Sequence, residues 1–316
     1  MREAGGPVVA LSGGIGGAKL ALGLSRVLPP AELMVVANTG DDFEHLGLAI
    51  SPDLDTLMYT LAGLDDPERG WGRRDETWNF MAALETIGGE TWFQLGDRDL
   101  AVHIERTRRL AMGERLSLIT RDFCGRHRVT ARVIPMSDDR VRTRLRTSTG
   151  WIDFQDYFVR QRCVPEITAL SYEGAASAMA HPEVLEALGD PQLRAVVICP
   201  SNPFLSIEPI LAVRGMREAL RTSVAPVVAV APIVGGQAIK GPTAKMMMEL
   251  DVPISAAAVA ERYADIIDGY IVDHADADAK VAFPLTVTHT LMRTLQDREA
   301  LARAALAVAD ALAKAK

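Results

Sequence analysis

Short runs of consecutive apolar residues alternate along the chain with segments whose apolar positions recur every three or four residues. Residues 8–11 form the first run, and after it Leu20, Leu24 and Leu28 share one helical face. Residues 33–37 form the second run. A strand, a helix and a strand at this spacing predict a parallel pair of strands joined by a right-handed crossover.

The same pattern returns in the last third of the chain. Residues 195–199, 226–231 and 269–273 are mostly apolar runs, which are typical of strands covered on both faces. A helix is expected over about 209–220, and the C-terminal helix carries an apolar stripe that suits core packing. The pattern predicts an α/β fold with a Rossmann-like, doubly wound, mainly parallel sheet. This nucleotide-binding core would be discontinuous and would comprise residues 1–60 and 190–316.

Residues 61–189 follow a different pattern. Helices are expected over 75–86 and 117–123, and a strand over 129–134. Residues 141–158 indicate a hairpin, because apolar and polar positions alternate before a Ser-Thr-Gly turn and aromatic and β-branched residues follow it. We expect this segment to be an inserted α+β region that covers the carboxyl rim of the sheet and binds a second, acceptor ligand.

A serine and four glycines follow the first predicted strand, and the helical pattern begins near a lysine. The residues of this glycine loop that we expect at a phosphate are Ser12, Gly13, Gly14, Gly16, Gly17 and Lys19. Glycines let backbone N–H groups approach an oxyanion, and a helix N-terminus adds partial positive charge. The loop does not match a P-loop, because Leu20 stands where Ser or Thr is required. It does not match a dinucleotide fingerprint either, because Lys19 stands where a small residue is required. A tight turn without a ligand is the alternative.

Acidic residues follow the second predicted strand, in the segment Asn38-Thr39-Gly40-Asp41-Asp42. Parallel strands end at one edge of a sheet, so this segment should lie beside the glycine loop. An acid there commonly holds ribose hydroxyls, and a loop cap is the alternative. Further on, Asp53 or Asp55 is expected to cap a helix that begins at Thr56. Two carboxylates beside a phosphate site also suit Mg²⁺.

The segment Gly96-Asp97-Arg98-Asp99 precedes another predicted helix. We expect Asp99 to cap that helix and His103 to lie in the core or beside a partner. Asp97 and Arg98 would then lie in the preceding loop, where an exposed ion pair contributes little stability. The arginines of the helix are expected on a solvated face: Arg106, Arg108 and Arg109.

Two tryptophans and one polar cluster have competing interpretations. Trp78 is expected in the core, whereas Trp71 could belong to the core or form a flat wall for a ring-bearing ligand. His274, Asp276 and Asp278 could bind a metal, but their spacing favours an exposed loop.

Composition narrows the function classes. The chain has 316 residues, is 48% hydrophobic and has a net charge of −7, which argues against nucleic acid as the main partner. Its three cysteines lack metal-ligand spacing, which favours a reducing, cytoplasmic location. We expect no signal peptide. We also expect no membrane span, because proline and glycine interrupt the longest uncharged stretch, residues 222–239.

Several motifs taken together, in this order, resemble the 2-phospho-L-lactate transferase family of coenzyme F420 biosynthesis. They are the glycine loop, Asn38-Thr39-Gly40-Asp41-Asp42, Ser51-Pro52-Asp53-Leu54-Asp55-Thr56, Leu95-Gly96-Asp97-Arg98-Asp99, Pro135-Met136-Ser137-Asp138-Asp139, Pro200-Ser201-Asn202-Pro203 and Ile239-Lys240-Gly241-Pro242. One residue departs from the family pattern: Gln94 stands where the family often has a basic residue near the deazaflavin.

The resemblance implies a transferase with two substrates. The donor would be a small acid, such as phospholactate, phosphoenolpyruvate or 3-phosphoglycerate, joined through a diphosphate to guanosine. The acceptor would be the deazaflavin Fo, whose terminal ribityl hydroxyl attacks the phosphorus that carries the acid, so that GMP leaves. Mg²⁺ would neutralise the diphosphate, and a homodimer is expected.

The resemblance also assigns roles to residues. The glycine loop, Ser201 and Asn202 would hold guanosine and its phosphate, and Asp53 and Asp55 would hold Mg²⁺. The catalytic candidates are Asp53, Asp55 and Asp97. The residues expected near the deazaflavin or the donor acid are Asn38, Thr39, Asp41, Asp42, Asp55, Gln94 and Arg98.

Two other functions compete with a transferase. A nucleotide-sugar-binding regulatory protein of the same superfamily would share the glycine loop and the segment Ser201-Asn202-Pro203. The aspartate pair at 53 and 55 and the Gly96–Asp99 segment favour the transferase. An NAD-linked dehydrogenase is disfavoured, because the dinucleotide fingerprint is broken at Lys19.

Overall fold

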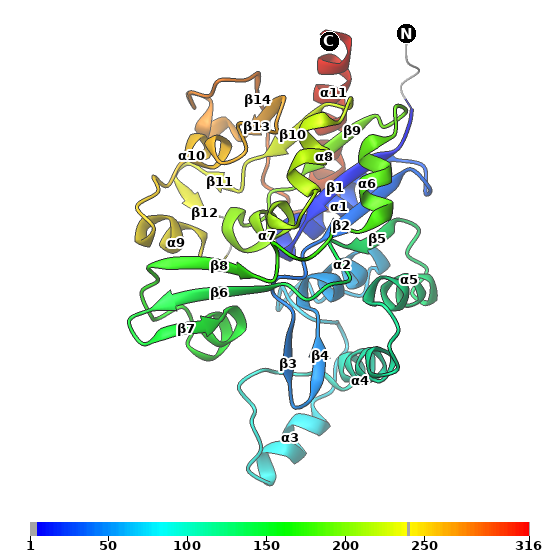
Figure 1. Ribbon diagram of the computed structural model, residues 1–316, viewed down its shortest axis with the longest axis vertical. Coiled ribbons are helices and arrows are strands. Elements are labelled where there is room, and N and C mark those ends of the chain that lie inside the picture. The colour runs from blue at the N-terminus through cyan, green and yellow to red at the C-terminus, as the bar shows by residue number, and fades with distance from the viewer. Residues whose placement is uncertain (1–4, 239–240, 316) are drawn as a thin grey trace.

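The fold is built on a seven-stranded sheet in which each neighbouring pair is parallel, with the order β14-β13-β10-β9-β1-β2-β5. The computed structural model describes residues 5–238 and 241–315. The strands are β1 (Val8–Ser12), β2 (Leu33–Ala37), β5 (Arg132–Pro135), β9 (Ala195–Ile198), β10 (Val227–Val230), β13 (Gly269–Val272) and β14 (Leu285–Val287). The predicted α/β class and doubly wound, parallel sheet are confirmed (Figure 1).

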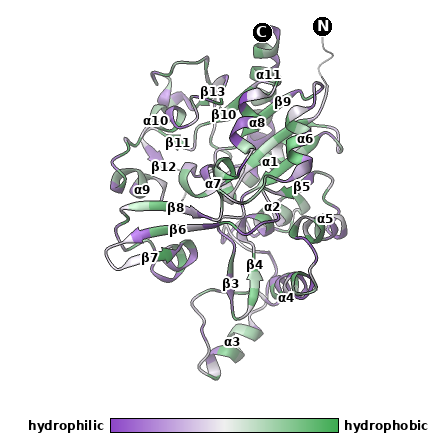
Figure 2. Cartoon of the chain, viewed as in Figure 1, coloured by the Kyte–Doolittle hydropathy of each residue, from purple (hydrophilic) through white to green (hydrophobic). Residues whose placement is uncertain are grey.

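Side chains alternate between two hydrophobic layers along each central strand. Val8 and Ala10 of β1 pack with one layer, whereas Val9 and Leu11 pack with the other. Helices that cover the first face are α1 (Gly14–Val27), α2 (Pro52–Ala62), α5 (Leu116–Arg126) and α11 (Leu295–Ala315). Helices that cover the second face are α6 (Pro182–Gly189), α7 (Glu208–Ala212), α8 (Met216–Thr222), α9 (Thr243–Glu249) and α10 (Ala256–Glu261). The central strands are mostly hydrophobic in Figure 2, as burial on both faces requires.

Two smaller units extend from the central sheet. The first contains the hairpin of β3 (Phe43–His45) and β4 (Leu48–Ile50), with α3 (Asn79–Thr86) and α4 (Asp97–Ala111). The β3–β4 hairpin and α3 project away from the sheet in Figure 1. The second is a three-stranded antiparallel sheet of β7 (Gly150–Asp153), β6 (Arg142–Thr147) and β8 (Ala169–Glu173), with the π-helix η1 (Asp156–Arg160).

The segment predicted as an insertion, residues 61–189, contributes to the core as well. Its strand β5 is an edge strand of the central sheet and pairs with β2, and α5 packs beside it. The hairpin expected within 141–158 is present as β6 and β7, but residues 156–160 form a π-helix instead of continuing the strand. The helix expected from residue 75 begins at Asn79.

The helix expected over 209–220 is broken into three elements. The π-helix η2 (Pro203–Ile207) leads into α7, and α8 begins after Gly215. Gly215 has a φ of 90°, which glycine adopts without strain, so the chain can turn between α7 and α8. The remaining elements are β11 (Ile233–Val234), β12 (Gln237–Ala238) and the short 3₁₀-helix η3 (His274–Asp276). Within residues 5–238 and 241–315, no helix is long and apolar enough to cross a bilayer.

Candidate functional site

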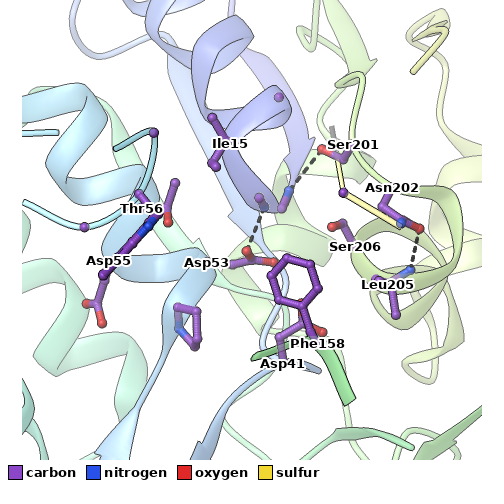
Figure 3. A pocket seen from close by; sticks show the side chains of 18 of the residues that line it. Ile15, Asp41, Asp53, Asp55, Thr56, Phe158, Ser201, Asn202, Leu205 and Ser206 are labelled. Carbon is purple, nitrogen blue, oxygen red and sulfur yellow. Dashed lines mark hydrogen bonds between the residues drawn. The ribbon is translucent and has the colours of Figure 1, made fainter. Parts of the chain in front are cut away.

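A cavity of about 670 Å³ opens at the carboxyl edge of the central sheet (Figure 3). Its walls come from the segments that follow β1, β2, β9 and β10, from the first turn of α2, and from η1 and η2. The order of the strands reverses between β1 and β9, and ligands of doubly wound sheets bind at such a point. The cavity is therefore where the fold predicts a ligand.

The glycines after β1 allow close packing against the segment after β9. A Cβ atom on Gly13 would lie 2.6 Å from Asp53 Oδ2, and one on Gly16 would lie 2.5 Å from the carbonyl oxygen of Pro200. Gly14 differs, because its φ of 62° requires a left-handed conformation and its nearest neighbour, Ser206 Oγ, would be 3.9 Å from a Cβ. The loop is thus tightly packed on one side and open to the cavity at Gly14.

The predicted nucleotide-binding residues divide into two groups. Those that line the cavity are Gly13, Gly14, Gly16, Lys19, Ser201 and Asn202. Ser12 and Gly17 lie behind them, where a Cβ on Gly17 would meet the Oγ atoms of Ser12 and Ser201. Asn202 Oδ1 accepts hydrogen bonds from Phe204 N and Leu205 N, so this side chain also caps η2.

Asp53 contacts the glycine loop instead of capping its own helix. Its Oδ1 accepts a hydrogen bond from Gly14 N at 2.7 Å, and its Oδ2 accepts one from Asn38 Nδ2 at 2.8 Å. The expected helix start at Thr56 is wrong, because α2 begins at Pro52 after the N-cap residue Ser51. Neither Asp53 nor Asp55 is the cap. Asp53 instead places negative charge at the positive end of α1.

Three buried carboxylates gather near this loop. Burial raises the pKa of Asp42 to about 7 and that of Asp53 to about 6. Burial, followed by the charge of Asp53, raises the pKa of Asp41 well above its usual range. Within the part of the chain that the structure describes, the Oδ1 atoms of Asp41 and Asp42 have no hydrogen-bond partner. A bound divalent cation would stabilise the ionised form of these carboxylates, and an all-oxygen set fits Mg²⁺.

Asp55 faces α4 and forms a buried ion pair. Arg106 donates one hydrogen bond to Asp55 Oδ2 at 3.1 Å and a second to Asp55 Oδ1. The expectation that Arg106 lies on a solvated face is wrong, since it is only 2% exposed. The same guanidinium contacts His103 Nδ1 at 3.3 Å and the carbonyl oxygen of Ala49 at 3.3 Å. Asp53 and Asp55 therefore have different partners, and shared ligation of Mg²⁺ by the two stays a prediction.

A second possible metal set lies at the same wall. Asp55, Asp99 and His103 each offer a ligand atom within 4.8 Å of the others. However, Arg106 already contacts both Asp55 Oδ2 and His103 Nδ1. A guanidinium in that position repels a metal cation, so the arginine itself neutralises this set.

Tyr59, Asp99 and His103 line the cavity and were not expected there. The Tyr59 hydroxyl donates to Asp99 Oδ1 at 2.5 Å, and His103 Nε2 lies 3.2 Å from Asp99 Oδ2. Asp99 lies within the first turn of α4, whose N-cap is Gly96, so the expected capping role of Asp99 is wrong. The four-residue spacing of Asp99 and His103 places them on one helical face, and this spacing is the sequence signal that could have identified the pair.

Asp97 stabilises the start of α3 through hydrogen bonds. It accepts hydrogen bonds from Thr77 Oγ1 at 2.6 Å and from the backbone N–H groups of Asn79 and Phe80, at the start of α3. These hydrogen bonds lower the pKa of Asp97 to about 2. Among the described residues, neither Asp97 nor Arg98 lines the cavity, whereas Gln94 does. The catalytic role expected for Asp97 thus finds no support in its position.

The other residues expected near the deazaflavin or donor acid are also divided. Asp41 and Asp55 line the cavity, but in the described chain Asn38, Thr39 and Asp42 lie outside its lining. Thr39 is buried, and Asn38 supports Asp53. Ile239 and Lys240, part of one family motif, lie outside the described residues.

Aromatic side chains line part of the cavity. They are Trp71, Trp92, Phe93, Phe154 and Phe158, together with Tyr59. Trp71 is 48% exposed and meets Trp78 edge-on at 6.3 Å between ring centroids. Trp78 is half-buried and packs with the small cluster around Met81, so its predicted core position is only partly met. His274 and Asp278 are exposed, as the favoured interpretation of an exposed loop predicts, and among the described residues only Asp55, Asp99 and His103 qualify as a possible metal set.

Comparisons with known proteins give one family. The family model described as 2-phospho-L-lactate transferase CofD matches residues 8–310. A phosphoenolpyruvate transferase of Streptomyces coelicolor is 43% identical, covering 98% of this chain and 99% of the relative. A phosphoenolpyruvate transferase of Kitasatospora aureofaciens is 42% identical, covering 96% of this chain and 98% of the relative.

A solved structure supports the fold. A UPF0052 family member from Bacillus halodurans superimposes with a TM-score of 0.63 at 14% identity, covering 96% of this chain and 99% of that one. At this identity the likeness concerns the fold alone. The family match and the curated relatives carry the assignment: the chain belongs to the 2-phospho-L-lactate transferase CofD family, transferases of coenzyme F420 biosynthesis.

Proposed function

We propose that this chain transfers a phospho-(small acid) group from a guanosine-diphosphate-linked donor to the terminal ribityl hydroxyl of Fo. The hydroxyl oxygen bonds to the phosphorus that carries the acid, and the bond from that phosphorus to the bridging oxygen breaks. GMP leaves with the bridging oxygen, and the hydroxyl proton passes to a base or to water. The observation that carries the proposal is one cavity joining the glycine loop to an aromatic wall.

The guanosine diphosphate part would bind at the carboxyl edge between β1 and β9. Gly14, Ile15 and Gly16 begin α1 at the cavity, so their N–H groups belong to the positive end of that helix. Gly14 N–H already donates to Asp53, which leaves Ile15 and Gly16 as the amide donors nearest to a phosphate. Lys19, whose Nζ donates to the carbonyl oxygen of Met292 at 3.2 Å, adds positive charge at the rim.

Mg²⁺ is proposed as the cofactor. Asp41 and Asp53 would hold it, because both are buried carboxylates that line the cavity and carry raised pKa values. Asp55 stays the further candidate that the family resemblance implies. When bound, the ion would neutralise the diphosphate and the charge that develops on the leaving GMP.

The acceptor ring would bind at the aromatic wall. Trp92 and Phe93 contact one another at 5.8 Å between centroids, and Phe43 and His45 pack behind them. Phe158 faces the cavity from the π-helix η1 (Figure 3). Flat aromatic surfaces suit a tricyclic ring, and they lie beside the glycine loop in the same cavity.

The donor acid is proposed to be enolpyruvate. Relatives that are 42% and 43% identical over nearly their whole lengths are named phosphoenolpyruvate transferase. Mass spectrometry of the product from Fo and each guanylated donor tests this choice. We expect enolpyruvyl product in excess over the lactyl and glyceryl products; a preference for either of the others contradicts the choice of acid.

The alternative is a nucleotide-sugar-binding regulatory protein of the same superfamily. Thermal-shift measurements separate the two functions. We expect Fo together with GDP to raise the unfolding temperature, since both would bind in the cavity. Stabilisation by UDP-sugars but not by Fo with GDP would overturn the transferase proposal.

A further inference from the structure

Asp99 presents a carboxylate to the cavity, and each of its two oxygens has a close polar neighbour. The Tyr59 hydroxyl donates to Oδ1 at 2.5 Å, and His103 Nε2 lies 3.2 Å from Oδ2. All three residues line the cavity, and His103 is buried. The side chain of Asp99 is 16% exposed and lines the cavity, where a ligand can reach it.

The protonation of His103 follows from its neighbour. Arg106 Nη1 lies 3.3 Å from His103 Nδ1, and a guanidinium nitrogen can only donate a hydrogen bond. His103 Nδ1 therefore accepts, and the ring proton belongs on Nε2, on the side of Asp99. Arg106 is itself held by its two hydrogen bonds to Asp55. This buried chain of contacts places the imidazole Nε2 of His103 beside the Asp99 carboxylate.

The charge of Asp99 restricts what can bind beside it. Burial opposes ionisation, but the hydrogen bond from His103, and then the hydrogen bond from Tyr59, hold the pKa of Asp99 below its usual range. An ionised carboxylate attracts hydroxyl donors and repels phosphate and carboxylate groups. The donor carries several negative charges, whereas the ribityl chain of Fo carries hydroxyls and no charge.

The position of Asp99 also separates the two substrates. Asp99 lies on α4, the helix that follows the aromatic pair Trp92 and Phe93, and all three line the cavity. The glycine loop belongs to the β1–α1 connection, and its Gly14 N–H donates to Asp53. A polyol attached to a ring on the aromatic wall would thus meet Asp99, whereas the guanosine ribose would lie nearer the β1–β9 edge.

From these contacts we infer that Asp99 accepts hydrogen bonds from the ribityl hydroxyls of the acceptor, with Tyr59 and His103 as positioning residues. The inference rests on the proposed function, because it takes Fo as the acceptor. It assigns to Asp99 the discrimination between Fo and a deazaflavin that lacks the hydroxylated chain.

Calorimetric binding of two ligands tests the inference: Fo, and a ring analogue with N10-methyl in place of the ribityl chain. Asp99→Asn should lower the affinity for Fo by about tenfold or more, because a hydrogen bond to a charged group is lost. The affinity for the ring analogue should stay nearly unchanged. Tyr59→Phe should weaken Fo by a smaller factor, because the carboxylate remains. Glu105→Gln, on the exposed side of the same helix, is the matched control.

The outcomes are distinct. Equal weakening of both ligands by Asp99→Asn would indicate a packing role and overturn the inference, as would unchanged Fo binding. If EDTA lowers the affinity of the wild type for Fo to that of Asp99→Asn, the effect belongs to a bound metal, and this result would also overturn the inference. Failure of the wild type to bind Fo at all overturns the proposed function itself, whereas wild-type binding that Asp99→Asn leaves intact overturns only this inference.

Discussion

Asp53→Asn is expected to strengthen the binding of GDP in the absence of divalent metal. Asp53 Oδ1 accepts the hydrogen bond of Gly14 N at 2.7 Å, so a carboxylate already occupies the first amide of α1. A diphosphate at the next amides would lie beside this charge. Two like unit charges about 6 Å apart repel by about 3 kcal/mol at an effective dielectric constant of about 20. This energy corresponds to a factor of about a hundred in Kd, and salt reduces it.

Titration calorimetry with GDP, first in EDTA and then in Mg²⁺, measures the effect. The variant should bind metal-free GDP about tenfold or more tightly than the wild type, and should gain less affinity from Mg²⁺. Asparagine keeps an acceptor for Gly14 N–H but places an amide against Asn38 Nδ2, so the unfolding temperature is measured alongside. Asp122→Asn, a similar charge change on α5, is the control. A folded Asp53→Asn protein with unchanged or weaker metal-free binding refutes the reasoning.

Three further predictions concern the same site and its support. Gly16→Ala should lower the free energy of unfolding by about 1–3 kcal/mol, because its Cβ would lie 2.5 Å from the carbonyl oxygen of Pro200. Urea unfolding measures this change, and an unchanged midpoint would mean that α1 shifts freely. Asp97→Ala should lower the unfolding temperature while leaving kcat near that of the wild type, because Asp97 caps α3 outside the cavity; complete loss of turnover in a folded variant would restore its catalytic role. Burial raises the pKa of Asp42 from 3.8 to about 7, so the folded state holds a proton that the unfolded chain releases, and wild-type stability should fall as pH rises through that range. Asp42→Asn cannot titrate and should gain stability relative to the wild type between about pH 4 and pH 7 in EDTA; a constant difference contradicts the raised pKa.

The architecture could be predicted because its signals are local. Continuous apolar runs such as residues 33–37 and 195–198 identify strands buried on both faces, and β2 has the predicted bounds. The break between α7 and α8 at Gly215 was missed, because an isolated glycine does not by itself end a helical pattern. The place of β5 at the edge of the central sheet was missed as well, because pairing with β2 is a contact between strands about a hundred residues apart.

The position of the cavity could be predicted for a similar reason, but the pairing of its charges could not. The end of a parallel strand places Gly14 and Asp41 at one edge whatever their side-chain partners are. The contacts that decide the chemistry join distant segments: Asp53 with Gly14, and Asp55 with Arg106. Arg106 was expected in solvent together with Arg108 and Arg109, because the three arginines lie close together on one predicted helix. Only tertiary packing distinguishes the buried arginine from the other two.

The central claim is that one cavity joins a guanylated donor to Fo and releases GMP. The most direct test is a single-turnover reaction of purified protein with Fo, the enolpyruvyl-diphospho-guanosine donor and Mg²⁺, analysed by mass spectrometry and nucleotide chromatography. The account predicts a phosphodiester of Fo bearing the acid, formed together with an equal amount of GMP. Release of GDP in place of GMP, or no Fo-derived product while the nucleotide binds, would contradict it.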